Sequence, residues 1–205
     1  MPIPNDVFTK ETAVSYDDLR PKIQNGDILL CSGSDGFSPL IQKATACPWS
    51  HVGFIFKMDD IDRVMVLESV DRAGVRTQAL SSMVAGNGKN IAPYSGKMIV
   101  ARHDKFSELS NPTKLRLMSQ FAVDRFASPY NAWEIFSIGL RLGMARIGIR
   151  LPRVKLSGAF ICSEYAAACY EPIGIQFSPN RLGFIAPGDL AADKDVNPVG
   201  VLQVP

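Results

Sequence analysis

Several features that mark other protein classes are scarce or missing in this sequence. Its 205 residues include only four cysteines and two histidines, and no cysteines are spaced as Cys-x-x-Cys. A small disulfide-rich framework is therefore not indicated, and we expect the thiols to be reduced. Cys47 and His51 form a Cys-x3-His spacing, but no second Cys/His pair lies nearby in the sequence. We therefore expect no metal site and no cofactor.

Strong charge and a leader-like segment are also missing. The formal net charge is +2 and charged residues make up 20%, which argues against a dedicated nucleic-acid-binding protein. The first residues show no basic region followed by an apolar one, so we expect no secretory signal and a cytoplasmic protein. Apolar residues reach 46%, enough for one globular domain over 1–205, with residues 1–14 expected as a loose arm.

The residue pattern predicts a mixed α+β fold. Short strands are expected at 28–31, 52–56, 64–70, 75–80 and 97–103, separated by turns. Helices are expected just after Ser15, at 39–46, from 112 to the Ser-Pro pair at 128–129, and at 163–170. The segment 81–93 is rich in small residues and is expected to be a loop. This order indicates a small, mainly antiparallel sheet packed against helices.

Two short motifs far apart in the chain carry the candidate chemistry. Cys162 follows an apolar run and opens a good helix-forming stretch, while His51 opens a strand-like run. A helix N-terminus favours a thiolate, and a neighbouring imidazole can hold that thiolate and later return a proton. The pair therefore predicts a cysteine hydrolase or acyltransferase. The backbone N–H of Cys162 is the natural first donor of an oxyanion hole, and the sequence assigns no second donor.

These motifs, taken with three further segments, resemble a known family. The segments are Gly-Asp-Ile-Leu-Leu at 26–30, Ser-His-Val-Gly at 50–53, Ser-Pro-Tyr-Asn at 128–131, Cys-Ser-Glu at 162–164 and Pro-Gly-Asp-Leu at 187–190. In this order they are similar to the circularly permuted papain-like amidases, the YaeF/YiiX-type relatives of the NlpC cell-wall peptidases. In unpermuted relatives the cysteine helix precedes the histidine strand, and here the order is reversed. The resemblance implies a permuted, papain-like α+β fold with a Cys-His-polar triad.

Glu68 is the expected third member of that triad. It lies near the end of the strand that follows the His51 strand, and in an antiparallel hairpin the two side chains can share one face. An acidic residue here also fits the resemblance. Ser69 and Asp71 are the alternatives if the register slips. In the implied mechanism Cys162 attacks the carbonyl, His51 protonates the leaving amine, and the third residue holds the imidazole.

Four further residues are candidates for contact with substrate: Trp49, Ser50, Tyr130 and Asp27. Two of them have structural alternatives, because Trp49 could simply pack and a Gly-Asp pair before a strand often caps its own turn. The remaining histidine, His103, is expected at a strand end. Cys169 lies among alanines and is expected to be a buried, inert thiol.

The substrate class is left open between two kinds of enzyme and a binding module. We expect hydrolysis of an amide in a small peptide, for which a cell-wall peptide is one candidate. A basic, apolar segment at 133–155 carries too many arginines to span a membrane, yet it suits a helix on an anionic membrane surface or over a groove. A plain helix packed on the sheet is the alternative. The membrane-facing interpretation favours a lipid-directed thiol acyltransferase or esterase, similar to lecithin retinol acyltransferase. A non-catalytic ligand-binding module is the third alternative.

Overall fold

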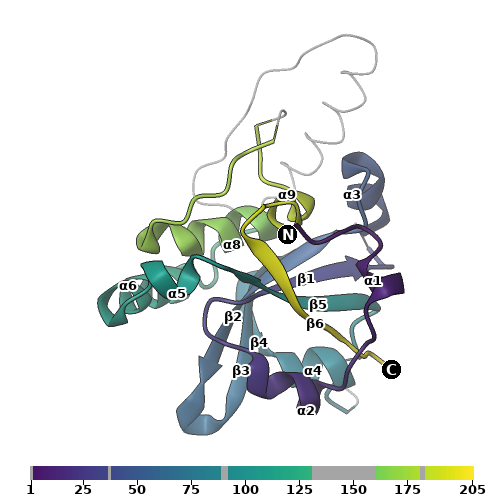
Figure 1. Cartoon of the computed structure of the whole chain (residues 1–205), viewed down its shortest axis with the longest axis horizontal. Helices are drawn as coiled ribbons and strands as arrows, with labels where there is room; N and C mark the ends of the chain where they lie inside the picture. The colour runs from purple at the N-terminus through teal and green to yellow at the C-terminus, as the bar shows by residue number, and fades with distance from the viewer. Residues whose placement is uncertain (1, 37, 89–91, 131–159, 181–182) are drawn as a thin grey trace.

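A six-stranded antiparallel sheet organises this computed structural model, which describes residues 2–36, 38–88, 92–130, 160–180 and 183–205 (Figure 1). The strand order is β4-β3-β2-β1-β5-β6. The strands are β1 (Ile28–Gly33), β2 (His51–Met58), β3 (Arg63–Val70), β4 (Gly74–Ala79), β5 (Gly96–His103) and β6 (Val196–Leu202). The first five lie where the sequence predicts them. The sixth was not predicted, because it contains Pro198, which is tolerated here since β6 is an edge strand with a register shift against β5.

Helices cover both faces of this sheet. On one face lie α6 (Pro112–Asp124), α8 (Cys162–Tyr170) and α9 (Pro187–Ala191), and on the other lie α2 (Tyr16–Leu19) and α4 (Leu80–Ala85) (Figure 1). The central strand β1 is fully buried from Ile28 to Cys31, and its alternate side chains enter two separate apolar clusters. A continuous apolar run is therefore what this strand requires, since neither of its faces meets water.

The shorter helical elements join these layers. They are α1 (Val7–Lys10), α3 (Ser38–Thr45), α5 (Phe106–Leu109) and the 3-10 turns η1 (Arg20–Lys22), η2 (Asp59–Ile61) and η3 (Glu171–Ile173). The helix expected just after Ser15 is α2, and Ser15 is its N-cap, because its hydroxyl accepts a hydrogen bond from the backbone N–H of Asp18 at 3.2 Å.

Two helical expectations need correction. The segment expected as a loop at 81–93 contains most of α4, which buries Leu80, Met83 and Val84 against the sheet. Six residues are too few for a helical period to stand out in a sequence. In α6, the sequence pattern places Leu117 and Met118 on or near one apolar stripe, but only Met118 is buried, whereas Leu117 is 49% exposed.

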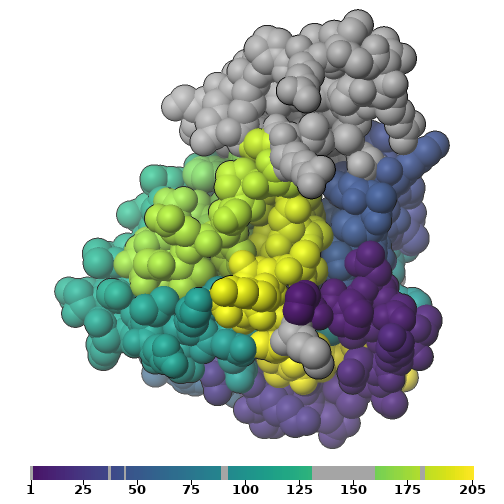
Figure 2. Space-filling view, turned by 45° about the horizontal axis from the view of Figure 1, so that its top comes forward, coloured from purple at the N-terminus to yellow at the C-terminus, as the bar shows by residue number. Residues whose placement is uncertain are grey.

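The N-terminal residues pack on the rest of the chain, so the expectation of a loose arm is wrong. Ile3 and Val7 are buried, and the backbone N–H of Ile3 donates to the carbonyl of Ala191 at 2.9 Å. Figure 2 shows the N-terminal segment lying against the C-terminal one on the surface. The Phe8 ring packs on Trp49, with ring centroids 5.3 Å apart. The arm thus supports the segment that leads into His51.

The helices of the described residues do not meet the requirements for crossing a membrane. Among the described residues, no helix combines the length and the apolar character needed to cross a membrane. The basic apolar segment expected at 133–155 lies outside the described residues.

Candidate active site

Cys162 and His51 are brought together by the packing of α8 on β2. Cys162 is the first residue of α8, and His51 is the first residue of β2. Their side chains are hydrogen-bonded to each other, and the sulfur also accepts from the backbone N–H groups of Val52 and Ser163. The expected pairing of helix N-terminus and strand start is therefore present in the fold.

Glu68 completes a relay of three side chains. Its Oε2 lies 2.7 Å from Nε2 of His51, which leaves Nδ1 of the ring for Cys162. The fallback residues do not take this place: Ser69 donates its hydroxyl to the carbonyl of Phe160 at 2.7 Å, and Asp71 lies in the β3–β4 turn. The hairpin thus selects the expected carboxylate.

Gly53 lies where β2 and β3 pack too closely for a side chain. The β2–β3 register pairs Phe54 with Leu67, and continuing it by one residue sets Gly53 opposite Glu68, diagonal to His51. A Cβ atom at Gly53 would lie 2.3 Å from Cγ1 of Val66. The glycine of the Ser-His-Val-Gly motif is therefore required by close packing between the strands.

Two residues of β4 hold the second oxygen of Glu68. Arg76 donates from Nε at 3.0 Å and from Nη2 at 2.9 Å, and Gln78 donates from Nε2 at 3.1 Å, all to Oε1. Arg76 stands directly across from Glu68 in the β3–β4 register, and Gln78 stands across from Val66 on the same face. Neither residue was predicted from the sequence. The two-residue spacing of Arg76 and Gln78 shows in the sequence that they share one face of β4. Only the β3–β4 register shows that this face carries Glu68.

The charges of this relay shift the ionisation of each member. Burial opposes the thiolate, but the charge and hydrogen bond of His51, with two backbone N–H groups, lower the pKa of Cys162 below its ordinary value. Burial likewise opposes the imidazolium, yet Cys162 and Glu68 raise the pKa of His51 to about 10. For Glu68, His51 and Arg76 outweigh burial and lower the pKa. These contacts therefore favour a thiolate–imidazolium pair backed by a carboxylate.

A cavity of about 200 Å³ opens beside Cys162 and is lined by all three relay residues. Two of the expected binding residues, Ser50 and Tyr130, also line it. The Ser50 hydroxyl accepts from the backbone N–H of Gly33 at 2.9 Å, so part of its role is structural. The Tyr130 phenol keeps its proton, because burial and the charges of Cys162 and Asp71 raise its pKa.

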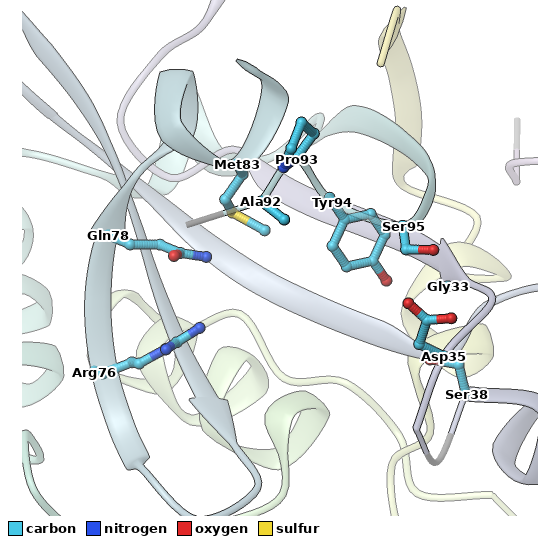
Figure 3. Close-up of a pocket in the computed structure, with 10 residues that line it drawn as sticks. All are labelled: Gly33, Asp35, Ser38, Arg76, Gln78, Met83, Ala92, Pro93, Tyr94 and Ser95. Carbon is cyan, nitrogen blue, oxygen red and sulfur yellow. The ribbon is translucent and has the colours of Figure 1, made fainter. Parts of the chain in front are cut away.

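A second cavity, of about 290 Å³, adjoins the first (Figure 3). The two share five lining residues: Ser38, Arg76, Gln78, Met83 and Tyr94. In Figure 3 the side chains from β4 stand on one side, and Asp35 and Tyr94 stand on the other. Tyr94 was not among the expected site residues; it lies between the expected loop at 81–93 and the strand expected at 97–103.

The other two expected binding residues lie away from the cavities. Trp49 is 1% exposed and packs on Phe8, which is the packing alternative. Asp27 precedes β1, at the opposite end of this strand from the Cys31–His51 pair. Its carboxylate pairs with Arg102 at 2.7 and 2.9 Å and accepts from the backbone N–H of Gln24 at 2.8 Å. Asp27 is therefore a structural residue at a turn, and the expectation that it contacts substrate is corrected.

The remaining cysteines have different surroundings. Cys31 and Cys169 are buried, and burial raises the pKa of each thiol. Cys47 is partly exposed, and its sulfur lies 3.1 Å from the hydroxyl of Thr45. No two of the four are joined in a disulfide. Cys162 differs from the two buried thiols because its surroundings favour the thiolate, and its side chain lines a cavity together with a base.

Comparison with known proteins shows the fold. No protein-family model and no curated protein sequence matches this chain. Among solved structures, the chain is similar to the metalloprotein YiiX from Escherichia coli O157:H7, of the DUF1105 family. The match has 17% sequence identity and a TM-score of 0.60, and it covers 89% of this chain and 98% of YiiX. This chain therefore has a YiiX-like α+β fold with a six-stranded antiparallel sheet.

Because YiiX is a metalloprotein, the groups able to hold a metal are relevant here. Within the described part of the chain, one such group exists: ligand atoms of His103, Asp193 and Asp195 all lie within 4.8 Å of one another. However, Lys105 Nζ lies 2.6 Å from Oδ2 of Asp195, and the backbone N–H of Asp195 donates to Asp193 at 2.9 Å. An ammonium group is thus already bound where a cation would bind. As arranged, this group does not fit a metal ion, and it lines neither cavity.

Proposed function

We propose that this protein is a cysteine hydrolase of the amidase or peptidase kind, built on a circularly permuted papain-like scaffold. The observation that carries this proposal is the relay Cys162–His51–Glu68, which opens on a cavity of about 200 Å³. Cys162 lies at a helix N-terminus, and the charges of Cys162 and Glu68 favour the protonated form of His51. Glu68 is buried and hydrogen-bonded by residues of β4. The YiiX-like fold and the order of the sequence motifs support the same proposal.

The reaction follows from these positions. The Cys162 thiolate attacks the amide carbonyl carbon, and the carbonyl π electrons move to oxygen. As the C–N bond breaks, the His51 imidazolium gives its proton to the leaving amine, and a thioester remains on Cys162. Neutral His51 then takes a proton from water, whose oxygen attacks the thioester. The carboxylic acid leaves, and the thiolate–imidazolium pair returns.

The negative charge that forms on the oxygen of the tetrahedral intermediate requires hydrogen-bond donors close to Cys162. The backbone N–H of Cys162 has no acceptor within its own helix, because it is the first residue of α8. The Tyr130 hydroxyl lines the cavity beside the sulfur and stays protonated. We assign these two groups as the oxyanion donors.

The size of the cavity favours a small substrate. Its lining mixes apolar surface with polar groups: besides Ile41, Val70 and Met83, the lining residues carry hydroxyl, carboxylate, amide, guanidinium, imidazole or thiol groups. Such a lining can accept a short peptide, and a cell-wall peptide remains one candidate. The lipid-directed alternative depends on the segment at 133–155, which lies outside the described residues. A binding module without turnover would not need a buried carboxylate held at 2.7 Å behind the imidazole.

Acylation by an activated ester tests the proposal without knowledge of the natural substrate. With p-nitrophenyl acetate we expect a burst of p-nitrophenolate and an acetyl group on Cys162, detected by mass spectrometry. Cys162→Ala should remove the burst, whereas Cys47→Ala, which changes the partly exposed cysteine, should keep it. A set of short peptide p-nitroanilides then tests amide cleavage. An equal burst in wild type and Cys162→Ala would contradict the proposal.

A further inference from the structure

The third member of the relay is itself held by a second layer of residues. Glu68 has a side chain that is only 2% exposed, so its two oxygens must find partners inside the protein. Oε2 faces His51 at 2.7 Å, and Oε1 accepts three hydrogen bonds, two from Arg76 and one from Gln78. The two oxygens therefore have separate duties, one toward the base and one toward β4.

A fixed positive charge at Oε1 matters for the state of the other oxygen. A buried carboxylate next to an imidazolium can take the proton from the ring, which leaves two neutral groups and no charge to stabilise the thiolate. Arg76 opposes this transfer, because its positively charged guanidinium lies 2.9 Å from the carboxylate. Gln78 adds a neutral donor in the same place and fixes the carboxylate plane.

We propose that Arg76, assisted by Gln78, is a positioning residue that keeps Glu68 ionised and aimed at His51, and so sets the pH range in which Cys162 reacts. The inference rests on the proposed function and extends the three-residue relay to five residues. Arg76 acts through Glu68 and does not touch the sulfur. Arg76 lies directly across from Glu68 on the neighbouring strand, so the pairing register of β3 and β4 fixes the contact between them.

Other ionisable groups face Glu68 without replacing Arg76. From β2 comes His51, from α8 Cys162, from β1 Cys31, and from the segment before β5 Tyr94. Burial raises the pKa of both Cys31 and Tyr94, so these two stay neutral. Within the described residues, Arg76 is thus the permanent cation bonded to this carboxylate.

Arg76 also lines both cavities, and its side chain is 44% exposed (Figure 3). A variant could therefore disturb substrate binding as well as the relay. A small alkylating reagent separates the effect on substrate binding from the effect on the relay. Iodoacetamide reacts with the thiolate of Cys162 and does not have to occupy the second cavity. The pH dependence of this reaction is the readout that a merely structural role of Arg76 would not move.

The experiment measures the alkylation rate of Cys162 against pH in wild type, Arg76→Gln, Arg76→Lys and Gln78→Ala. For Arg76→Gln we expect the acidic limb to move to higher pH by about one unit, which is about a tenfold slower reaction on that limb, as a lost charge-assisted hydrogen bond predicts. Arg76→Lys should fall between, because it keeps the charge but not the two-nitrogen contact. Gln78→Ala should shift the limb less.

Arg72→Gln is the matched control, because it removes an arginine at 94% exposure from the β3–β4 turn. It should leave the profile unchanged. If Arg76→Gln does not fold, by circular dichroism, Arg76→Lys and Gln78→Ala decide. A wild-type acidic limb in the folded Arg76 variants would overturn the inference while leaving the proposed function in place. A wild-type Cys162 that does not react would instead overturn the proposed function.

Discussion

Glu68→Gln is the most informative single substitution, because the amide replaces the charge and nearly keeps the shape. Three donors from Arg76 and Gln78 converge on Oε1, so the oxygen of the new amide must stay on that side. Its NH2 group then points at Nε2 of His51, 2.7 Å away in the native pair. An imidazolium would present an N–H to that NH2 group, and two donors cannot bond to each other. The substitution thus favours the neutral ring with its proton on Nδ1.

The size of the effect follows from the contact that is lost. A hydrogen bond between charged groups contributes about 1.5–3 kcal/mol, which corresponds to about one to two pKa units. We therefore expect the pKa of His51 to fall from its value of about 10 by at least that much, and the pKa of Cys162 to rise. Turnover should fall about 10- to 100-fold while some activity remains, since Glu68 orients the base and does not react.

Two measurements on Glu68→Gln test this reasoning. One is the pH dependence of Cys162 alkylation, whose acidic limb should move to higher pH. The other is turnover of p-nitrophenyl acetate at neutral pH. Glu108→Gln, at an exposed position of α5, controls for the loss of one negative charge. If the profile and the turnover of Glu68→Gln equal those of wild type, the carboxylate does not act on the base and the relay is misassigned.

Three further predictions follow from the same contacts. The pH profile of kcat/KM should be a bell, rising at lower pH than an ordinary thiol would because the pKa of Cys162 is lowered, and falling near pH 10 with the pKa of His51; a profile that still rises there would contradict the ion pair. Gly53→Ala should lower the free energy of unfolding by about 1–3 kcal/mol, with part of the loss recovered in Gly53→Ala/Val66→Ala; simple additivity in denaturant melts would refute the clash. Asp27→Asn should cost about 1–3 kcal/mol in the same assay because it breaks a buried ion pair, yet leave the alkylation of Cys162 unchanged; slower alkylation would return it to the site.

Much of the site could be predicted from the sequence, because its main members lie at element boundaries. The helix at Cys162 and the strand at His51 each have a clear local pattern, and a hairpin can bring Glu68 to the face of the histidine. The continuous apolar run of β1 likewise indicates a strand that is buried on both faces. Where the local pattern and the fold agree, residue types alone placed the element.

The missed parts depend on contacts between distant segments. Arg76 gains its meaning only from a cross-strand register, and a one-residue slip would turn it to the opposite face. The N-terminal arm contains too few apolar residues for the sequence to predict that it packs on the domain. Ile3 and Val7 nevertheless join an apolar cluster formed mainly by other elements. Asp27 shows the converse: its motif suggested a site, but Arg102, 75 residues later, binds it as a structural ion pair.

The central claim is that Cys162 is the reactive thiolate, and competition among the four cysteines tests it most directly. Cys162 is only 4% exposed, whereas Cys47 is partly exposed, so exposure and electrostatics make opposite predictions. The protein is treated with a limited amount of iodoacetamide near neutral pH, and the modified cysteines are followed in time by mass spectrometry. We predict that Cys162 reacts first and that His51→Ala removes its advantage. If Cys47 reacts first and Cys162 stays unmodified, Cys162 is a buried, inert thiol and the proposed hydrolase is wrong.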